Sequence, residues 1–301
     1  MKKQEFGYLV LLFLTAFVWG ATFILVKWTV SEMDVYYYLF LRFFVAFVSL
    51  LIFYPKQFFR VDKKTIRSAF ILGVLLFSAY AAQTEGLRFT PATHSALISG
   101  LYLIFIPFFS FLLLRQHVPL PAFFGALISF VGLYFLTQYS YTGINVGDGL
   151  TLLSAFIYTW HILFTGKVAK EHSIRALVLW QFFFITLLSG SIAAAKGEFI
   201  FTFSSLALLT IFITGIFATS FAFIIQTAAQ RIIEPTRIGI IFALEGAIGA
   251  YFAWAFGGET LSFISFMGAC FMVFGVMISE LSMFFFILCR RGKKILCMKP
   301  L

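Results

Sequence analysis

Charged side chains are scarce in this sequence. Its 301 residues include 22 basic and 12 acidic side chains, together 11% of the chain, whereas ordinary soluble domains are about 25% charged. A soluble chain of this length would need far more charge to cover its one or two cores. The scarcity therefore excludes a water-soluble globule, and we expect lipid to be the solvent for most of the surface.

Cysteine is also rare, and the sequence lacks the patterns of metal and disulfide sites. Cys270, Cys289 and Cys297 lie toward the C-terminal end without the spacing of zinc ligands or of a disulfide framework. We expect these three residues to be reduced thiols. The sequence predicts neither a metal nor another cofactor.

Motifs of intramembrane and phosphate-dependent enzymes are missing. The Gly-x-Gly-Asp turn of aspartyl proteases does not occur, because Gly147-Asp148 follows Asn145-Val146. Ser99-Gly100 and Ser189-Gly190 lack the earlier glycine of a Gly-x-Ser-Gly serine-protease motif. No His-Glu-x-x-His sequence and no glycine-rich phosphate loop is present. An intramembrane enzyme is therefore the least favoured class of function.

Long apolar runs are what the sequence has in abundance. The hydrocarbon core of a bilayer is about 30 Å thick, so a helix needs about 20 apolar residues to cross it. Ten such runs follow one another with short connections, at residues 7–30, 35–54, 67–87, 92–114, 120–138, 148–168, 174–195, 205–229, 236–256 and 261–288. We therefore expect an all-α integral membrane protein with ten transmembrane helices. The first run is too long for a signal peptide, so we expect it to be retained.

The distribution of basic residues predicts the orientation in the membrane. Lys and Arg are retained on the cytoplasmic side, and an even number of spans places both termini together. With cytoplasmic termini, 18 of the 22 basic residues lie in cytoplasmic segments, only Lys27, Arg88 and Lys196 lie outside, and Arg42 lies within a span. The net charge of +10 then reflects membrane topology, and we expect no nucleic-acid partner.

The sequence contains an internal repeat. The segment from Leu14 to Trp19 is similar to that from Leu153 to Tyr158, and Arg42-Phe43-Phe44 aligns with Gln181-Phe182-Phe183 at the same offset of 139 residues. Further matches, in the same order and with slowly drifting offsets, are Gly73 and Ser78 with Gly215 and Ser220, Pro91 with Pro235, and Gly125 and Gly132 with Gly268 and Gly275. Residues 1–140 and 141–288 are therefore predicted to be two copies of a five-helix unit, followed by a basic cytoplasmic tail at 289–301.

An odd number of helices in each copy has a mechanical consequence. Because five is odd, the second copy enters the membrane from the opposite side, which gives an inverted-topology repeat. Two similar halves of opposite orientation can exchange conformations, and the exchange opens a central cavity to each side of the membrane in turn. We expect a solute to bind between the halves, near the membrane midplane.

Several motifs carry a resemblance to a known family. They are Trp19-Gly20, Arg42-Phe43, the segment from Pro91 to Gly132, Ile241-Phe242-Ala243-Leu244-Glu245, Gly258-Glu259-Thr260-Leu261, and Gly268 to Gly275. With these motifs the sequence resembles the EamA-type transporters of the drug/metabolite transporter superfamily over nearly its whole length. The resemblance implies a ten-helix carrier of small metabolites, often an exporter, in a bacterial inner membrane. The family commonly has proline after the glutamate of the ninth span, where this chain has Gly246.

Charged residues within the spans are the first candidates for a solute site, because a charge in a membrane needs a partner or water. Glu245 lies near the middle of the ninth span beside Gly246 and Gly249. It could bind a substrate ammonium or carry a coupling proton, and the alternative is a structural hydrogen bond. Arg42 could clamp a carboxylate or phosphate, but the uncharged Gln181 at the equivalent position favours a structural role.

Aromatic and amide side chains form a second group of candidates. Trp19 shares a helix stripe with Thr15 and Thr22, and the equivalent Tyr158 repeats part of that stripe, so these rings could wall a cavity. His161 could titrate near neutral pH, although a neutral, hydrogen-bonded histidine is favoured. Further polar candidates for the cavity, each with helix packing as the alternative, are Tyr80, Gln83, Tyr102, Gln181 and Gln226.

Secondary active transport is the function that the sequence predicts. The solute is expected to be a small metabolite, amino-acid-like or otherwise polar or amphipathic, and export is the favoured direction. Without an ATP-binding loop the energy must come from a gradient or an exchanged solute, and a proton cycle through Glu245 is the leading hypothesis. An exchanger of anionic metabolites such as nucleotide sugars, using Arg42, is the main alternative, and a lipid scramblase is a weaker one. The expected partners are a small solute, membrane lipid and a coupling proton.

Overall fold

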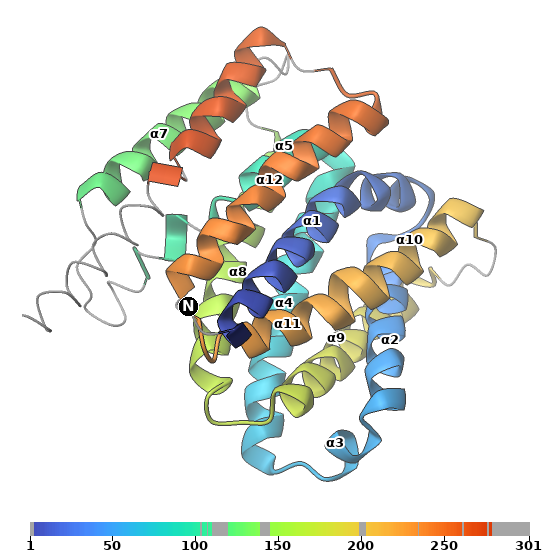
Figure 1. Cartoon of the computed structure of the whole chain (residues 1–301). Coiled ribbons are helices and arrows are strands. Elements are labelled where there is room, and N and C mark those ends of the chain that lie inside the picture. Colours follow the sequence, from blue (N-terminus) through green and yellow to red (C-terminus); the bar gives the residue numbers. More distant parts are fainter. Residues whose placement is uncertain are drawn as a thin grey trace, which may run out of the picture.

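The computed structural model describes residues 3–102, 104–106, 108–109, 120–138, 145–198, 203–233, 235–260, 262–275 and 277–278. Within these ranges all regular structure is helical (Figure 1). Six of the helices are long and apolar enough to cross a bilayer, and shorter apolar helices accompany them. The all-helical class of a multi-pass membrane protein is therefore confirmed.

The helices begin and end close to the expected boundaries. Their bounds are α1 Lys3–Glu32, α2 Val35–Phe53, α3 Pro55–Phe59, α4 Lys63–Phe89, α5 Ala92–Ser99, α7 Leu120–Gln138, α8 Val146–Val168, α9 Ile174–Lys196, α10 Ser205–Gly215, the π-helix η1 Ile216–Phe221, α11 Ala222–Ala229 and α12 Pro235–Gly257. A further helical segment covers Phe263–Gly275. The rest of the expected tenth span and the tail at 289–301 lie outside the described residues.

The fourth expected span differs from the structure. The α-helix that begins at Ala92 ends at Ser99, and a turn follows at Gly100 and Leu101 before helical backbone resumes. The amide of Leu101 donates to the carbonyl of Ile98 at 3.0 Å, three residues back, which is the tighter spacing of a 3₁₀ turn. The helix is thus interrupted within the fourth expected span, and residues 110–114 of that span lie outside the described residues. In contrast, α12 runs unbroken through Gly246.

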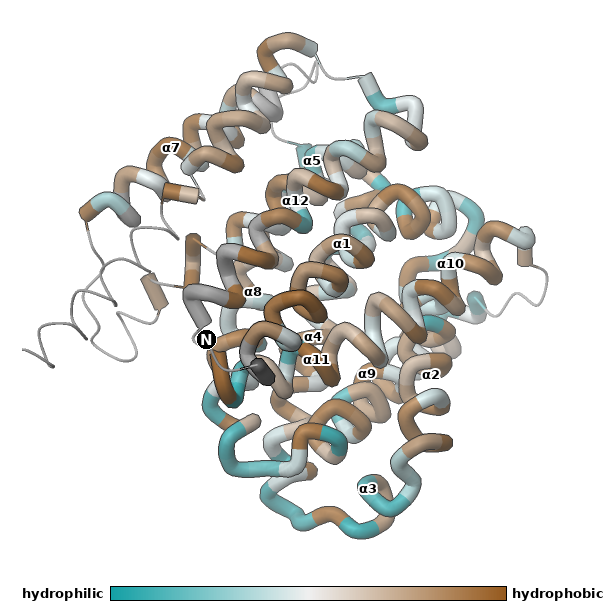
Figure 2. Tube along the Cα trace, viewed as in Figure 1, coloured by the Kyte–Doolittle hydropathy of each residue, from teal (hydrophilic) through white to brown (hydrophobic). Residues whose placement is uncertain are grey.

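Hydrogen bonds gather the helix termini into two opposite ends of the molecule. At one end, here called the inner end (residues 54–65, 167–175 and 230–233), the Thr65 hydroxyl lies 2.9 Å from His172 Nδ1, and Arg231 donates to the carbonyls of Ala169 and His172. At the other, the outer end (residues 27–34, 85–94, 145–148, 196–198, 203–204 and 257–260), Lys27 donates to the carbonyl of Thr90, and the Thr90 hydroxyl donates to Asp148. The polar segments of the inner end are visible below the apolar helices in Figure 2.

These contacts set the relative directions of the helices. The C-terminal end of α1 and the N-terminal end of α8 both lie at the outer end, because Lys27 and Asp148 meet through Thr90. Consequently α1 and α8, the first long helices of the two halves of the chain, run in opposite directions. A capping box begins α8: the Asn145 side chain accepts from the Asp148 amide, and the Asp148 side chain accepts from the Asn145 amide.

Three aromatic residues contact the residues aligned with them in the internal repeat. The ring centroids of Trp19 and Tyr158 are 6.4 Å apart, and those of Phe43 and Phe182 are 5.6 Å apart. Tyr80 and Phe223 are 6.4 Å apart. Before η1 the repeat offset in this region is 142 residues, as between Gly73 and Gly215. A π-helix accommodates one extra residue, so after η1 the offset is 143, and Tyr80 aligns with Phe223.

Candidate functional site

A cavity lies between the helices of the two halves of the chain. Its unfilled space is about 620 Å³ when the part open to solvent is counted. Side chains from α1, α2, α4, α8 and α12 and from the α5 region line it: Trp19, Thr22, Phe23, Val26, Arg42, Ala79, Tyr80, Gln83, Thr84, Leu87, Ser99, Tyr102, Ser154, Ala155, Tyr158 and Glu245.

Arg42 supplies the positive charge of the cavity. It lies on α2 and is only 4% exposed. Its Nε donates to the Thr219 hydroxyl at 2.9 Å, its Nη2 donates to the Tyr80 hydroxyl at 3.3 Å, and its guanidinium lies 4.5 Å from the centre of the Tyr80 ring. Among the described residues no carboxylate forms an ion pair with it. The guanidinium is thus held by neutral groups and retains its charge for a ligand.

Glu245 supplies the carboxyl group of the cavity. It lies on α12, is 6% exposed, and accepts a hydrogen bond of 3.1 Å from the Tyr102 hydroxyl to Oε2. Close packing fixes the backbone here, since a Cβ atom on Gly20 of α1 would lie 2.8 Å from the Glu245 carbonyl oxygen and one on Gly249 would lie 2.5 Å from the Cβ of Ala96. Glycines therefore let α1 and α5 approach α12 on either side of the carboxylate.

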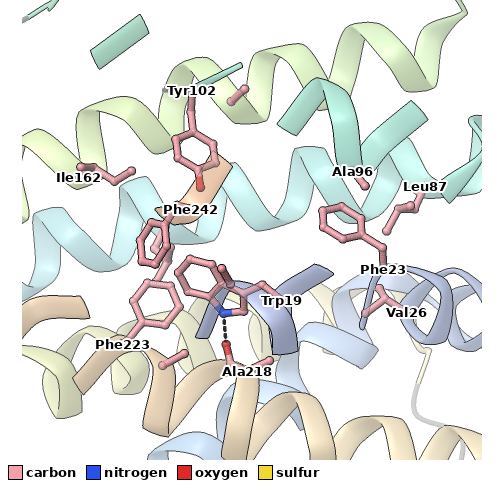
Figure 3. Close-up of a cluster of buried hydrophobic side chains, with 14 of the residues drawn as sticks. Trp19, Phe23, Val26, Leu87, Ala96, Tyr102, Ile162, Ala218, Phe223 and Phe242 are labelled. Atoms are coloured by element: carbon pink, nitrogen blue, oxygen red, sulfur yellow. Dashed lines mark hydrogen bonds between the residues drawn. The ribbon is translucent and has the colours of Figure 1, made fainter. Parts of the chain in front are cut away.

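Aromatic rings line and support the wall of the cavity. Trp19 Nε1 donates to the carbonyl of Ala218 in η1 at 2.7 Å (Figure 3), so the indole N–H is occupied and the ring is left as the contact surface. The Trp19 ring packs 4.9 Å from Phe242 and 5.6 Å from Phe223, centroid to centroid. The hydroxyl of Tyr102 points into the same cluster in Figure 3.

Seven of the candidate residues from the sequence line this cavity, namely Trp19, Arg42, Tyr80, Gln83, Tyr102, Tyr158 and Glu245. Gln181 and Gln226 are not part of its lining: Gln181 Oε1 is 3.3 Å from His161 Nε2, and Gln226 Oε1 accepts a hydrogen bond of 3.2 Å from the Tyr158 hydroxyl. The sequence analysis missed Ser99, which accepts a hydrogen bond of 2.8 Å from Gln83, and Thr219, which holds Arg42. No sequence pattern points to Thr219, because its contact with Arg42 depends on the approach of η1 to α2.

The cavity extends toward the outer end only. Its lining follows α1 from Trp19 to Val26 and α4 from Ala79 to Leu87, and in both helices these residues run from the middle toward the outer end. On the inner side, hydrogen bonds and ring contacts pack α8 against α9 and α11, as between Tyr158 and Gln226 at 3.2 Å. In the described conformation the cavity therefore lies between the middle of the molecule and the outer end, and packed side chains separate it from the inner end.

A carboxylate reinforces the mouth at the outer end. Glu259 accepts hydrogen bonds from the backbone amides of Ala92 and Thr93 at 2.7 and 2.9 Å, which caps the N-terminus of α5. Its Oε1 also lies 3.7 Å from Lys27 Nζ. The sequence placed Glu259 at the mouth, and the contacts give it a structural role in holding α1, α5 and the end of α12 together.

Comparison with known proteins adds the family. The model of the EamA-like transporter family matches the chain twice, at residues 6–138 and 145–281. The chain belongs to the EamA-like transporter family. An uncharacterized transporter of Archaeoglobus fulgidus is 30% identical over 89% of this chain and 84% of its own length, and a second from the same organism is 22% identical over 88% and 94%. A solved crystal structure with 15% identity aligns over 91% of this chain and 96% of its own, with a TM-score of 0.68, which shows the shared fold.

EamA membership and the apolar helices together make the protein a multi-pass membrane transporter. The relatives are named transporters without a named solute. The solute class must therefore be argued from the cavity of this chain.

Proposed function

We propose that the protein is a secondary active transporter that exports a small dipolar, amino-acid-like solute by alternating access. The observation that carries this proposal is the presence of Arg42 and Glu245 in one cavity, each buried and each held by hydroxyl groups. A solute with a carboxylate and an ammonium group would give each of them an ionic partner. The aromatic wall would cover the apolar part of such a solute.

The same arrangement weighs against the anionic alternative. A phosphorylated solute carries up to about two negative charges, and the described lining offers one cation for them, Arg42. A remaining negative charge would be buried without an ionic partner, which is costly. A solute with one carboxylate and one ammonium group fits one cation and one carboxyl group better.

We propose a ten-helix architecture of two inverted five-helix copies, at residues 1–140 and 141–288. The family model matches two consecutive segments of the chain, which supports the duplication. The opposite directions of α1 and α8 and the contacts between aligned aromatic residues support an inverted relation, because residues beside a two-fold axis meet their own counterparts.

We propose that both termini and the inner end face the cytoplasm of a bacterial cell, with the protein in the inner membrane. The supporting observation is the unequal distribution of basic residues. Under this orientation the cavity lies in the outer half of the protein, where an exported solute would be before its release.

We propose that Glu245, the one acidic residue among the described residues of the lining, couples solute export to proton entry. Glu245 can hold either a proton or the ammonium group of the solute, and these two occupants exclude each other. A carrier that returns with a proton after releasing the solute outside would be an antiporter, with export driven by proton entry.

Proteoliposomes loaded with a panel of radiolabelled solutes test this function. We expect counterflow exchange that zwitterionic amino acids inhibit and phosphorylated solutes do not. Glu245→Gln should abolish accumulation driven by a pH gradient and retain counterflow, because the amide still accepts from Tyr102. pH-driven accumulation by the variant would remove Glu245 from coupling, and lipid movement without solute flux would favour a scramblase.

A further inference from the structure

Four buried polar atoms without partners lie between α8 and α11. They are half of the eight buried side-chain atoms that find no hydrogen-bond partner within the described part of the chain: His161 Nδ1, Thr165 Oγ1, Gln226 Nε2 and Gln230 Oε1. Thr165 follows His161 by four residues and Gln230 follows Gln226 by four, so each pair faces one side of its helix. We call these four residues the buried polar seam.

The seam connects the cavity with the inner end. Tyr158, which lines the cavity, donates to Gln226 Oε1 at 3.2 Å, and Gln230 Nε2 donates to the carbonyl of Ile162 at 3.3 Å. Arg231, the next residue, belongs to the inner end. All four seam residues are at most 4% exposed. A buried polar atom without a partner is costly and needs an explanation beyond packing.

The internal repeat supplies that explanation. At the offset of 139 residues, the α1 side chains Trp19, Thr22 and Val26, which line the cavity, align with Tyr158, His161 and Thr165. At the offset of 143 that applies after η1, the α4 side chains Gln83 and Leu87 align with Gln226 and Gln230. The cavity lining from the first half thus maps onto the seam in the second half.

Gln181 fits the same correspondence. It aligns with Arg42 and does not line the cavity, and its side chain contacts His161 of the seam. Its position away from the cavity is what an exchange of the two halves predicts.

We infer that the buried polar seam is the inner half of the solute pathway, closed in this conformation. When α8 and α11 separate, the hydroxyl, amide and imidazole groups of the seam contact the polar groups of the solute as it enters from the cytoplasm. This inference rests on the proposed alternating-access transport and adds to it the residues that the solute meets on the inner side.

Cysteine accessibility tests the seam directly. In a chain with Cys270, Cys289 and Cys297 changed to Ser, Thr165→Cys should react with a membrane-impermeant thiol reagent applied from the inner side. Leu177→Cys, equally buried on α9 and also close to the inner end but outside the seam, is the matched control and should react far more slowly. Equal reaction at the two positions, in variants that still catalyse counterflow, would overturn the inference.

A second pair of variants covers the case in which the cysteine chain fails to fold. Thr165→Val and Thr210→Val each remove a buried hydroxyl without a partner, so both should melt at a higher temperature than the parent. Only Thr165→Val should slow counterflow, about fivefold for one lost hydrogen bond to the solute. Unchanged counterflow in Thr165→Val would contradict the inference. Because labelling requires no known solute, labelling without any flux would refute the proposed function alone, and flux without labelling would refute the seam alone.

Discussion

At the scale of single residues, Arg42 is the side chain on which the solute class depends. Its guanidinium is held by Thr219 and Tyr80 through two hydrogen bonds and by the face of the Tyr80 ring. In the sequence, the uncharged Gln181 at the equivalent position favoured a structural role for Arg42. In the structure the two residues have different environments, since Arg42 lines the cavity and Gln181 contacts His161, so the lack of charge on Gln181 does not argue against solute binding by Arg42. Under the proposed alternating access, Arg42 and Gln181 would face the solute in different conformations.

Replacing Arg42 should affect only solutes that carry a carboxylate. In Arg42→Gln we expect the KM for a zwitterionic amino acid to rise about tenfold or more, since a charged hydrogen bond contributes about 1.5–3 kcal/mol. The KM for the corresponding amine, which lacks the carboxylate, should stay near its parental value. Counterflow in proteoliposomes measures both.

Arg42→Lys serves as the control in that experiment. Lysine keeps the charge but cannot reproduce the two-sided hydrogen bonding of the guanidinium, so partial recovery of amino acid affinity is expected. An equal loss for the amino acid and the amine in Arg42→Gln would show a structural role.

At the scale of helices, the contact between α4 and α8 depends on the absence of side chains. A Cβ atom on Gly147 would lie 2.5 Å from the carbonyl oxygen of Gly86 and 2.8 Å from the amide nitrogen of Thr90. Both atoms belong to the backbone and cannot move aside cheaply. The close approach also places Thr90 within reach of Asp148, which fixes the start of α8 beside the end of α4.

Gly147→Ala should therefore destabilise the folded protein by about 1–3 kcal/mol, as overpacking of a tight contact does. The matched control is Gly149→Ala on the same helix, where an added Cβ would meet no atom within 4 Å. That control should be neutral or slightly stabilising, because alanine favours a helix. Thermal melting in detergent compares the two, and equal stability would contradict the packing argument.

The start of α4 contains an acid-sensitive cap. Asp62 accepts hydrogen bonds from the hydroxyl and the backbone amide of Thr65, and these bonds lower the pKa of its carboxyl below the usual value. A lowered pKa in the folded state means that the stabilisation is present above the ordinary pKa of aspartate and is lost as the pH falls through the folded-state value.

We therefore expect Asp62→Ala to be less stable than the parent at pH 7, with the difference shrinking as the pH falls into the acid range. Asp62→Asn is the control, because asparagine also caps helices but does not titrate. Melting temperatures measured across the pH range test this, and a difference that persists unchanged in acid would contradict the ionic contribution.

At the scale of the whole molecule, the side of the membrane from which each loop can be labelled tests the proposed inverted architecture. Residues Lys64 and Lys170 belong to the inner end, whereas Arg88 belongs to the outer end. In single-cysteine variants, Lys64→Cys and Lys170→Cys should both react with an impermeant thiol reagent from the cytoplasmic side, and Arg88→Cys should react from the outside. Labelling of Lys64→Cys and Lys170→Cys from opposite sides would refute the inverted repeat and, with it, the seam.

The sequence alone determined where the long helices lie, the candidates for the cavity and the repeat from which the seam was read. These features are local, because a backbone in lipid must satisfy its hydrogen bonds within each helix, and the length and polarity of each run record that requirement. The tertiary structure decided the turn at Gly100, the π-helix at Ile216–Phe221, the bond from Trp19 to Ala218, and the separation of Gln181 from the other candidates. It also decided toward which end the cavity lies. These depend on small differences in packing between distant helices, and residue identity along one helix does not encode them.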